Sequence, residues 1–425
     1  HFAILRALAI IRSCNCAYCP RFPQVEPTVA SRVSVHVNRA IVSAIRNDRE
    51  AGWAMNFDFS DDQKFLGNEA RKFLDGECTT QHVREVLNDD DKSHHDGVWT
   101  KVKEMGWLGT AIPEEHGGLG LGSLELCVLA EEMGRALAPV PFASTVYFFA
   151  EGLMIAGSET QKGAVLPGVA SGDVIGCYAA SEGPGNPDAS KLSVTFDGGK
   201  VSGTKIPVTD GDIATHAIVL AKEGSGASLV LVDLNGDGVT RTPVKTLEPT
   251  RSHAEIKFDG AAGERLGEAG AGAELHDAIM NRAAVLLAFE QLGGATRCLE
   301  MATDYAKERY AFGRPIGGNQ AIKHKLADMY VKNEVARSNC YYGAWALSTD
   351  AAELPEAAAA ARLAASEAYW YASKENIQTH GGMGFTWEVD CHLFYRRAKL
   401  LAVQAGAPKV WKEKLVRALE MKNAA

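Results

Sequence analysis

The chain changes its spacing of apolar residues twice along its length. From residue 60 to about 168 they recur at helical spacing, from about 173 to 263 they alternate with polar residues, and from 273 the helical period returns. This order predicts an α+β fold that is mainly α, with an N-terminal helical domain, a middle antiparallel β domain and a C-terminal four-helix bundle. We place these domains at 55–172, 173–265 and 266–425.

Local signals mark where individual elements begin and end. Ser60 is followed by two aspartates and Gln63, which predicts a helix N-cap with a capping box. A further helix is expected at 124–136, ended by Pro139 and Pro141. The β-rich runs span 174–180, 192–196, 200–208, 214–221, 228–232 and 254–258. The bundle helices are expected at about 273–310, 318–348, 355–379 and 389–421, the last broken at Gly406-Ala407-Pro408.

The first 54 residues differ from the rest in composition. They hold seven Arg but no Lys or Met, and the chain opens on His1. We expect the native protein to begin at Met55, which makes residues 1–54 an upstream extension. The alternative is a transit peptide, because Glu26 is the only acidic residue up to Arg46.

Composition and charge exclude several classes of function. The chain is 46% hydrophobic and 23% charged, as is typical of soluble globular proteins. It contains no run of about 18 apolar residues, so no membrane-spanning helix is expected. The net charge of -9 argues against a nucleic acid as the main partner.

The cysteines are expected to be free thiols. There are nine at irregular positions, which indicates a reducing compartment, and we expect the cytoplasm. Cys14, Cys16 and Cys19 lie close together, but no second cluster matches them as in a zinc site. No metal site is therefore expected.

Two predicted helices each end in a glycine turn with a polar group suited to a dinucleotide phosphate. The first turn reads RYAFGRPI from Arg309, and the second reads IQTHGGMGF from Ile377. A guanidinium offers a planar fork that matches phosphate oxygens, and Gly-Gly lets the backbone approach a phosphate closely. Each signal has an ordinary alternative: a cation at a helix C-terminus for Arg309, and a helix cap for the glycine pair.

Read together, these segments resemble the acyl-CoA dehydrogenase family, flavoenzymes that oxidise the α,β bond of acyl-CoA thioesters. The segment NQAIKHKLADM from Asn319 and the loop PEEHGG from Pro113 are also similar to family segments, and the resemblance covers residues 55–421. It implies bound FAD, an acyl-CoA substrate and an electron-transfer flavoprotein as electron acceptor. It also implies a homo- or hetero-oligomer, expected to be a tetramer built as a dimer of dimers.

The resemblance assigns the FAD contacts residue by residue. Arg309 and Phe312 would reach the FAD of a neighbouring subunit, and Gln320 would bind its adenosine part, although alone it would be an ordinary surface glutamine. Gln378, Gly381 and Gly382 complete this set. In the β domain, Thr209 would lie against the flavin N5 edge, where the hydride arrives, and Ser181 near the flavin pyrimidine. Pro207 stands where a tryptophan often covers the ring.

The catalytic base is missing from its usual places. Removing a weakly acidic α proton requires a carboxylate held against it in a dry site. The family's two known glutamate positions correspond to Ala405 and Ala283. Glu290 is the remaining candidate, but seven residues displace it by about 10 Å along the helix from Ala283, and ion pairing inside the fold is the other role considered for it.

Two hypotheses follow. In the first, the chain is an acyl-CoA dehydrogenase active in itself, with an unassigned base. In the second, it is a non-catalytic partner subunit. The segments LAPVPFAST from Leu137 and IQTHGGMGFTWEVDCHLFYRRAK from Ile377 resemble a bacterial branch that includes heteromeric enzymes, and the empty glutamate positions fit such a pair. A flavin monooxygenase of the same fold is a third, less favoured reading. The sequence also replaces the family's usual aspartate by Arg397, a change expected to affect subunit contacts.

Overall fold

The computed structural model describes residues 58–424. The predictions for residues 1–54, including the start at Met55, the transit peptide and the three clustered cysteines, lie outside this part. None of the helices in the described part has the length and apolar character that crossing a bilayer requires.

The N-terminal region is helical, as predicted. Its first helix, α3 (Asp61–Glu77), begins with the expected capping box: the Ser60 hydroxyl accepts a hydrogen bond from the Gln63 amide, and the Gln63 side chain accepts one from the Ser60 amide. The other helical elements are α4 (Thr80–Leu87), α5 (Asp96–Glu104), η1 (Trp107–Gly109), η2 (Glu114–His116), α6 (Ser123–Arg135), η3 (Ala143–Ala150), α7 (Glu151–Ala156) and α8 (Glu159–Ser171).

A sheet of eight strands follows. Its strands are β1 (Gly176–Ala179), β2 (Thr195–Asp197), β3 (Lys200–Thr209), β4 (His216–Glu223), β5 (Gly226–Asp233), β6 (Val239–Pro243), β7 (His253–Ala262) and β8 (Glu264–Leu266). The order is β6-β7-β3-β2-β4-β5-β8, with β1 paired to β4.

The sheet differs from the prediction in two respects. It is mixed rather than purely antiparallel, because β4 pairs in parallel with β1 and, at one residue, with β2. The long connection from β1 to β4 returns the chain in its original direction, and local patterns do not encode this return. Strands β6 and β8 were not predicted, since β6 lacks a buried residue and β8 has only three residues.

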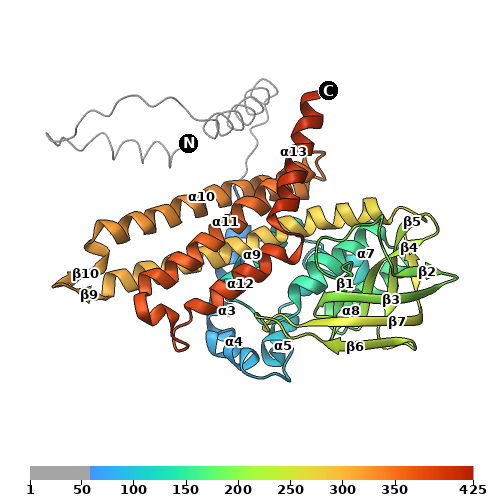
Figure 1. The fold of residues 1–425 in the computed structure, drawn as a ribbon, viewed down its shortest axis with the longest axis horizontal. Coiled ribbons are helices and arrows are strands. Elements are labelled where there is room, and N and C mark those ends of the chain that lie inside the picture. Colours follow the sequence, from blue (N-terminus) through green and yellow to red (C-terminus); the bar gives the residue numbers. More distant parts are fainter. Residues whose placement is uncertain (1–57, 425) are drawn as a thin grey trace. The chain divides into compact units, whose positions relative to one another are not determined.

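The C-terminal region is the predicted helical bundle. Its helices are α9 (Gly272–Glu308), α10 (Gln320–Ser348), α11 (Leu354–His380), α12 (Cys391–Gln404) and α13 (Pro408–Ala424). A small hairpin, β9 (Tyr310–Ala311) and β10 (Arg314–Pro315), joins α9 to α10 and continues into η4 (Ile316–Gly318), while η5 (Gly381–Phe385) follows α11. Figure 1 shows the sheet near one end of the bundle and this hairpin at the other.

Small residues bring α9 and α11 close together in the core. The buried face of α11 is rich in alanine, and Gly294 of α9 lies against the ring of Tyr369, where a Cβ atom would be only 2.4 Å from that ring. Larger side chains at this contact would separate the helices. The long α9 therefore lies close against α11 at this contact.

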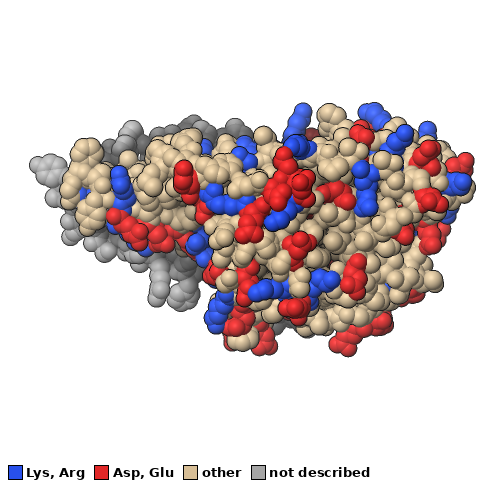
Figure 2. Space-filling view, turned by 90° about the horizontal axis from the view of Figure 1, so that it is seen from below, with Lys and Arg blue, Asp and Glu red and all other residues tan. Residues whose placement is uncertain are grey.

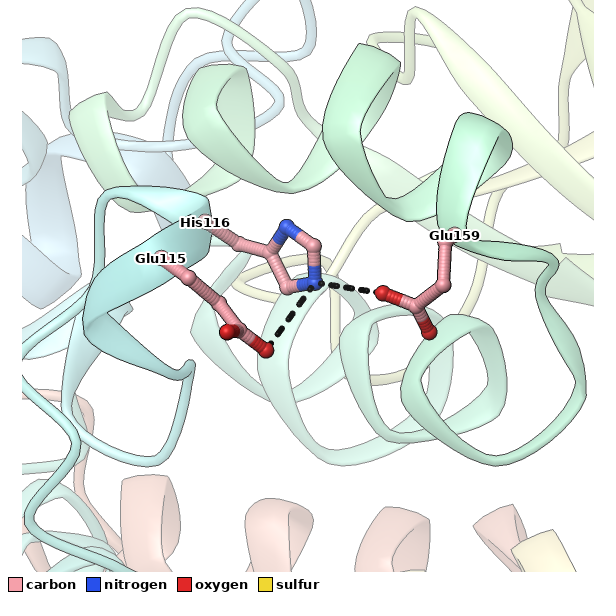
Figure 3. Close-up of side chains that lie close together, drawn as sticks. All are labelled: Glu115, His116 and Glu159. Carbon is pink, nitrogen blue, oxygen red and sulfur yellow. Dashed lines mark ion pairs between the residues drawn. The ribbon is translucent and has the colours of Figure 1, made fainter.

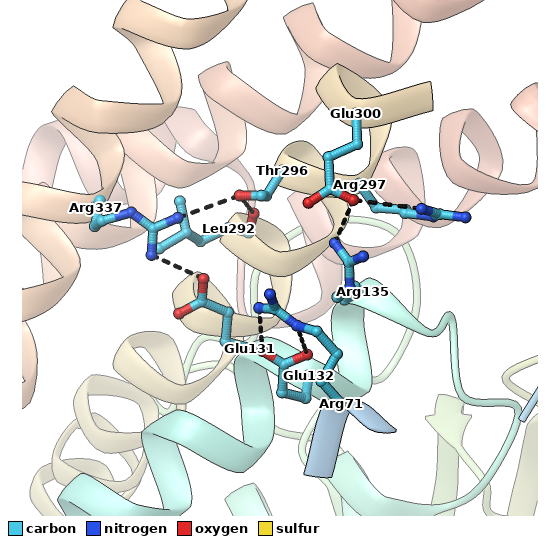
Figure 4. Close-up of polar contacts among 9 residues, drawn as sticks. All are labelled: Arg71, Glu131, Glu132, Arg135, Leu292, Thr296, Arg297, Glu300 and Arg337. Carbon is cyan, nitrogen blue, oxygen red and sulfur yellow. Dashed lines mark hydrogen bonds and ion pairs between the residues drawn. The ribbon is translucent and has the colours of Figure 1, made fainter. Parts of the chain in front are cut away.

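Ion pairs join the N-terminal helices to one another and to the bundle (Figure 4). Arg71 of α3 pairs with Glu132 of α6 at 2.6 Å, Arg135 pairs with Glu300 of α9 at 2.6 Å, and Arg337 of α10 pairs with Glu131 at 2.8 Å. On the face shown in Figure 2, acidic and basic side chains are interspersed.

Candidate functional site

A cavity lies where the N-terminal helices, the sheet and the bundle meet. It has a volume of about 980 Å³, and its walls come from η3, β1, β3, β7, α9, α12 and α13. Such a volume suits a large organic ligand. The apolar part of the lining includes Phe148, Met280, Leu400 and Trp411.

Both hydroxyl residues predicted to face a flavin line this cavity. Ser181 follows β1, and its hydroxyl donates to the Gly183 carbonyl at 3.1 Å. Thr209 ends β3, and its hydroxyl lies 3.2 Å from Nε2 of His253, its cross-strand neighbour on β7. Pro207 also lines the cavity. The structure therefore brings the two hydroxyls into one space, and their assignment to FAD remains a prediction.

His253 was not singled out from the sequence, although it contacts Thr209 directly. Its Nδ1 lies 3.0 Å from the Arg251 carbonyl, which can only accept, so Nδ1 carries the proton. Burial lowers the pKa of His253, although Asp210 opposes the shift. The neutral ring therefore offers Nε2 as an acceptor for the Thr209 hydroxyl.

A second histidine in the cavity is also held neutral. His276 of α9 lies 2.8 Å from the Tyr178 hydroxyl and stacks on its ring. Burial lowers the pKa of His276 to about 4. The pair of Tyr178 and His276 joins β1 to α9, which are far apart in the sequence. A local sequence pattern therefore could not predict it.

An ion pair fixes the loop that carries Ser181. Lys205 of β3 is fully buried and donates to Glu182 at 2.8 Å and to the Ala180 carbonyl at 3.1 Å. Burial alone would raise the pKa of Glu182, but hydrogen bonds from Lys205 and Ser193 outweigh it and bring the pKa to about 2. The loop is thereby anchored to β3 next to the cavity.

The cavity wall contains no unpaired carboxylate from the described residues. Ala405, one of the two family glutamate positions, lines the cavity, whereas Ala283 is buried and does not. The two acidic residues in the wall are Asp188, which pairs with Lys191 at 3.0 Å, and Asp277, which pairs with Lys414 at 2.5 Å.

Glu290 lies away from the cavity wall, in a buried cluster of charges. Its side chain is fully buried and pairs with Arg251 at 2.6 Å and with Arg397 at 3.5 Å. Arg397 also pairs with Glu248 at 3.0 Å. The ion pairing considered as one role for Glu290 is therefore present, and Arg397 makes its contacts inside the chain. Breaking such a buried pair leaves an uncompensated charge.

The remaining predicted FAD residues lie at the opposite end of the bundle, a region we call the tip: 309–320 and 378–382. Arg309 directly follows α9, Gln320 begins α10, and Gly381 follows α11 with a positive φ of 61°. Tyr305 stacks on His380 at 4.2 Å, which joins the ends of α9 and α11.

The polar side chains of the tip that are predicted to bind FAD are exposed and make no polar contact within the described part of the chain. Within residues 58–424, the side chains of Arg309, Gln320 and Gln378 make no hydrogen bond or ion pair, and Phe312 is fully exposed. None of these residues lines the cavity. One chain therefore does not bring the two halves of the predicted FAD site together, as Figure 1 makes clear from the distance between the hairpin and the sheet.

One group of side chains in the described part of the chain has metal-ligand character (Figure 3). Nε2 of His116 lies 3.5 Å from Glu159 and 3.9 Å from Glu115. Both glutamates are exposed, and Lys162 already pairs with Glu159 at 3.0 Å. We therefore assign this group an ion-pairing role between the loop that contains η2 and α8.

Comparison with known proteins agrees with this architecture. Residues 60–173 match the family model described as "Acyl-CoA dehydrogenase, N-terminal domain", and residues 270–420 match "Acyl-CoA dehydrogenase, C-terminal domain". Acyl-CoA dehydrogenase IpdE2 of Mycobacterium tuberculosis is 35% identical over 311 residues, which cover 72% of this chain and 82% of that protein. The human mitochondrial short-chain specific acyl-CoA dehydrogenase is 33% identical over 330 residues, covering 73% and 80%.

A solved structure shows the same fold in a two-protein assembly. The ChsE4-ChsE5 complex from Mycobacterium tuberculosis contains a chain that superposes with a TM-score of 0.78 at 27% identity. The match covers 86% of this chain and 99% of that one.

Proposed function

Since this chain belongs to the acyl-CoA dehydrogenase family, we propose that it is one subunit of a heteromeric, FAD-dependent enzyme that oxidises the α,β bond of an acyl-CoA thioester. A second chain of the same fold supplies the carboxylate base. This chain completes the flavin site of that partner through its tip. The proposal develops the second of the two hypotheses drawn from the sequence.

The residues present fit FAD in two separate places. At the tip, Arg309, Gln320 and Gln378 are exposed and unpaired within the described chain, beside Gly381 and Gly382, where an added Cβ would meet open space. This is the donor set that a pyrophosphate needs. The cavity offers the hydroxyls of Ser181 and Thr209. Because the two places are far apart, a complete site requires the tip of one chain and the cavity of another.

The chemistry that bound FAD supplies is acceptance of the β hydrogen as hydride. What the protein must add is a group that removes the α proton. In this chain the cavity wall has Ala405 at the expected position and carboxylates that are already paired, while Glu290 is held by Arg251 and Arg397. The absence of a usable carboxylate among the described cavity residues is the observation that carries the proposal.

An obligate assembly also explains the exposed apolar residues around the tip. Phe312 and Phe385 are exposed, as are Tyr330, Val331 and Val335 on α10. Large apolar side chains exposed in this number favour an interface on this part of the chain. We propose a tetramer in which these residues meet neighbouring chains, with an electron-transfer flavoprotein as the electron acceptor, in line with the family.

The test is anaerobic bleaching of the bound flavin by acyl-CoA. The chain alone is expected to bleach at a negligible rate, and co-expression with a glutamate-bearing homologue from the same genome is expected to restore bleaching at least a hundredfold. Light scattering on the same samples reports the assembly. A homo-oligomer of this chain that bleaches at the rate of the mixed assembly would favour the self-sufficient enzyme instead.

A further inference from the structure

The last residue of α12, Gln404, presents a primary amide at the cavity that the chain itself does not use. Gln404 lines the cavity next to Ala405. Both its Nε2 and its Oε1 are buried, and neither has a hydrogen-bond partner within residues 58–424. Most buried polar side-chain atoms are satisfied, so a donor and an acceptor left unpaired on one side chain require an explanation.

Other polar groups in the same wall have partners. Thr209 lies against His253, Tyr178 against His276, and Lys414 against Asp277 and Asn281. Retaining an unsatisfied amide costs stability, because each buried polar atom loses its bonds to water. A leucine of similar size would fill the same space without that cost. Gln404 is therefore a residue whose polarity serves a ligand rather than the fold.

We infer that Gln404 is a ligand-binding residue that hydrogen-bonds a part of the ligand able both to donate and to accept. A pair of secondary amides has this property, because the N–H of one donates to the Gln404 Oε1 and the C=O of the other accepts from Nε2. Coenzyme A carries two secondary amides in its pantetheine arm, so every acyl-CoA brings such a group into the cavity. A hydroxyl on the acyl group is the other source of the same chemistry. We assign the pantetheine amide, since it does not depend on a particular acyl group.

This inference rests on the proposed function only for the identity of the ligand as a CoA thioester. It does not require the chain to have a base, since it concerns binding. It also makes a prediction about the fold that is independent of any ligand. Replacing Gln404 by leucine removes two unsatisfied atoms, so Gln404→Leu is expected to melt at the same temperature as the parent protein or at a higher one.

The experiment compares binding of three probes to the FAD-loaded assembly with Gln404 or Gln404→Leu. Free CoA carries both amides and no acyl group, butyryl-CoA carries both amides and an acyl group, and S-ethyl thiobutyrate carries the thioester without any amide. Gln404→Leu is expected to raise the Kd for free CoA and butyryl-CoA about five- to thirtyfold, the effect of one or two neutral hydrogen bonds. The Kd for S-ethyl thiobutyrate should stay unchanged. Gln81→Leu, at an exposed position outside the cavity, serves as the control.

Three results would overturn the inference: an equal loss for all three probes, no loss for either CoA probe, or a marked drop in melting temperature. A loss seen only with 3-hydroxybutyryl-CoA, a fourth probe, would replace the amide assignment by the acyl hydroxyl. These outcomes are distinct from failure of the proposed function. A chain that binds free CoA through Gln404 but never supports bleaching with any partner would retain this inference and lose the proposal above.

Discussion

The polar side chains of the tip and of the cavity differ in whether they have partners inside the chain. At the tip, Arg309, Gln320 and Gln378 point into open surroundings with no partner in the described chain. In the cavity, polar groups such as Thr209 and Tyr178 are partnered inside the fold, with Gln404 as the exception. This difference supports the proposal that the tip meets another molecule, whereas the cavity would lack only the carboxylate that the proposed chemistry needs.

The largest expected effect concerns the buried charge cluster around Glu290. Glu290→Gln leaves Arg251 and Arg397 with less compensation in a fully buried place. We expect the free energy of unfolding to fall by about 3–5 kcal/mol, measured by urea denaturation. Glu300→Gln, on the same helix but half-buried, is the matched control, and its loss should be about 1 kcal/mol or less.

The same pair of variants tests whether Glu290 acts as the base that removes the α proton. We expect Glu290→Gln to leave the bleaching rate of the mixed assembly unchanged wherever the protein remains folded. A hundredfold loss of rate at unchanged stability would contradict the comparison, because Glu290 would then act in the chemistry.

The next effect is the pH dependence that the cavity histidine imposes on stability. The folded-state pKa of His276 is about 4, below its ordinary value of 6.5, because of burial. As the pH falls, His276 is therefore protonated at a higher pH in the unfolded chain than in the folded one. The stability from the neutral ring is complete above about pH 6.5 and is lost as the pH falls toward 4. The loss is expected to reach about 3 kcal/mol.

Urea denaturation at several pH values between 7 and 4 measures this loss of unfolding free energy. His276→Asn should remove that part of the pH dependence, whereas His324→Asn, at an exposed position of α10, should retain it. Identical pH profiles for the parent protein and His276→Asn would show that His276 is not held neutral.

The smallest expected effect is on FAD binding at the tip. Arg309→Ala removes a charge-assisted contact and is expected to raise the Kd for FAD about ten- to a hundredfold, corresponding to about 1.5–3 kcal/mol. Flavin retention on gel filtration and fluorescence titration both report it. Arg314→Ala is the matched control from the same hairpin, because Arg314 already bonds to Asn319 at 2.5 Å. If the parent protein, Arg309→Ala and Arg314→Ala bound FAD with equal affinity, the proposal of a shared FAD site would be wrong.

Local signals in the sequence predicted the fold, and motifs predicted where the candidate FAD residues of the tip would lie. The Ser60 capping box, the helix ends and the glycine turn at Gly381 depend on residues close together in the chain, so pattern and motif could predict them. The parallel pairing of β1 with β4 could not be predicted this way, because it depends on how a long connection returns to the sheet.

The cavity was harder to predict because its contacts join distant residues. Thr209 and His253 are 44 positions apart and meet only through the pairing of β3 with β7. The partners of Glu290 come from residues 251 and 397, in two other elements. A sequence shows that Glu290 sits in an apolar helix, but only the packed structure shows which charges compensate it.

The central claim is that this chain lacks a base in its own cavity, and Ala405→Glu tests it most directly. The substitution places a carboxylate in the cavity wall, and Ala405→Gln matches it in shape without the charge. We measure anaerobic flavin bleaching by butyryl-CoA in a single turnover, with the FAD-loaded chain and no partner. The account predicts that Ala405→Glu bleaches at least a hundredfold faster than both Ala405→Gln and the parent chain. Rapid bleaching by the parent chain alone would contradict it.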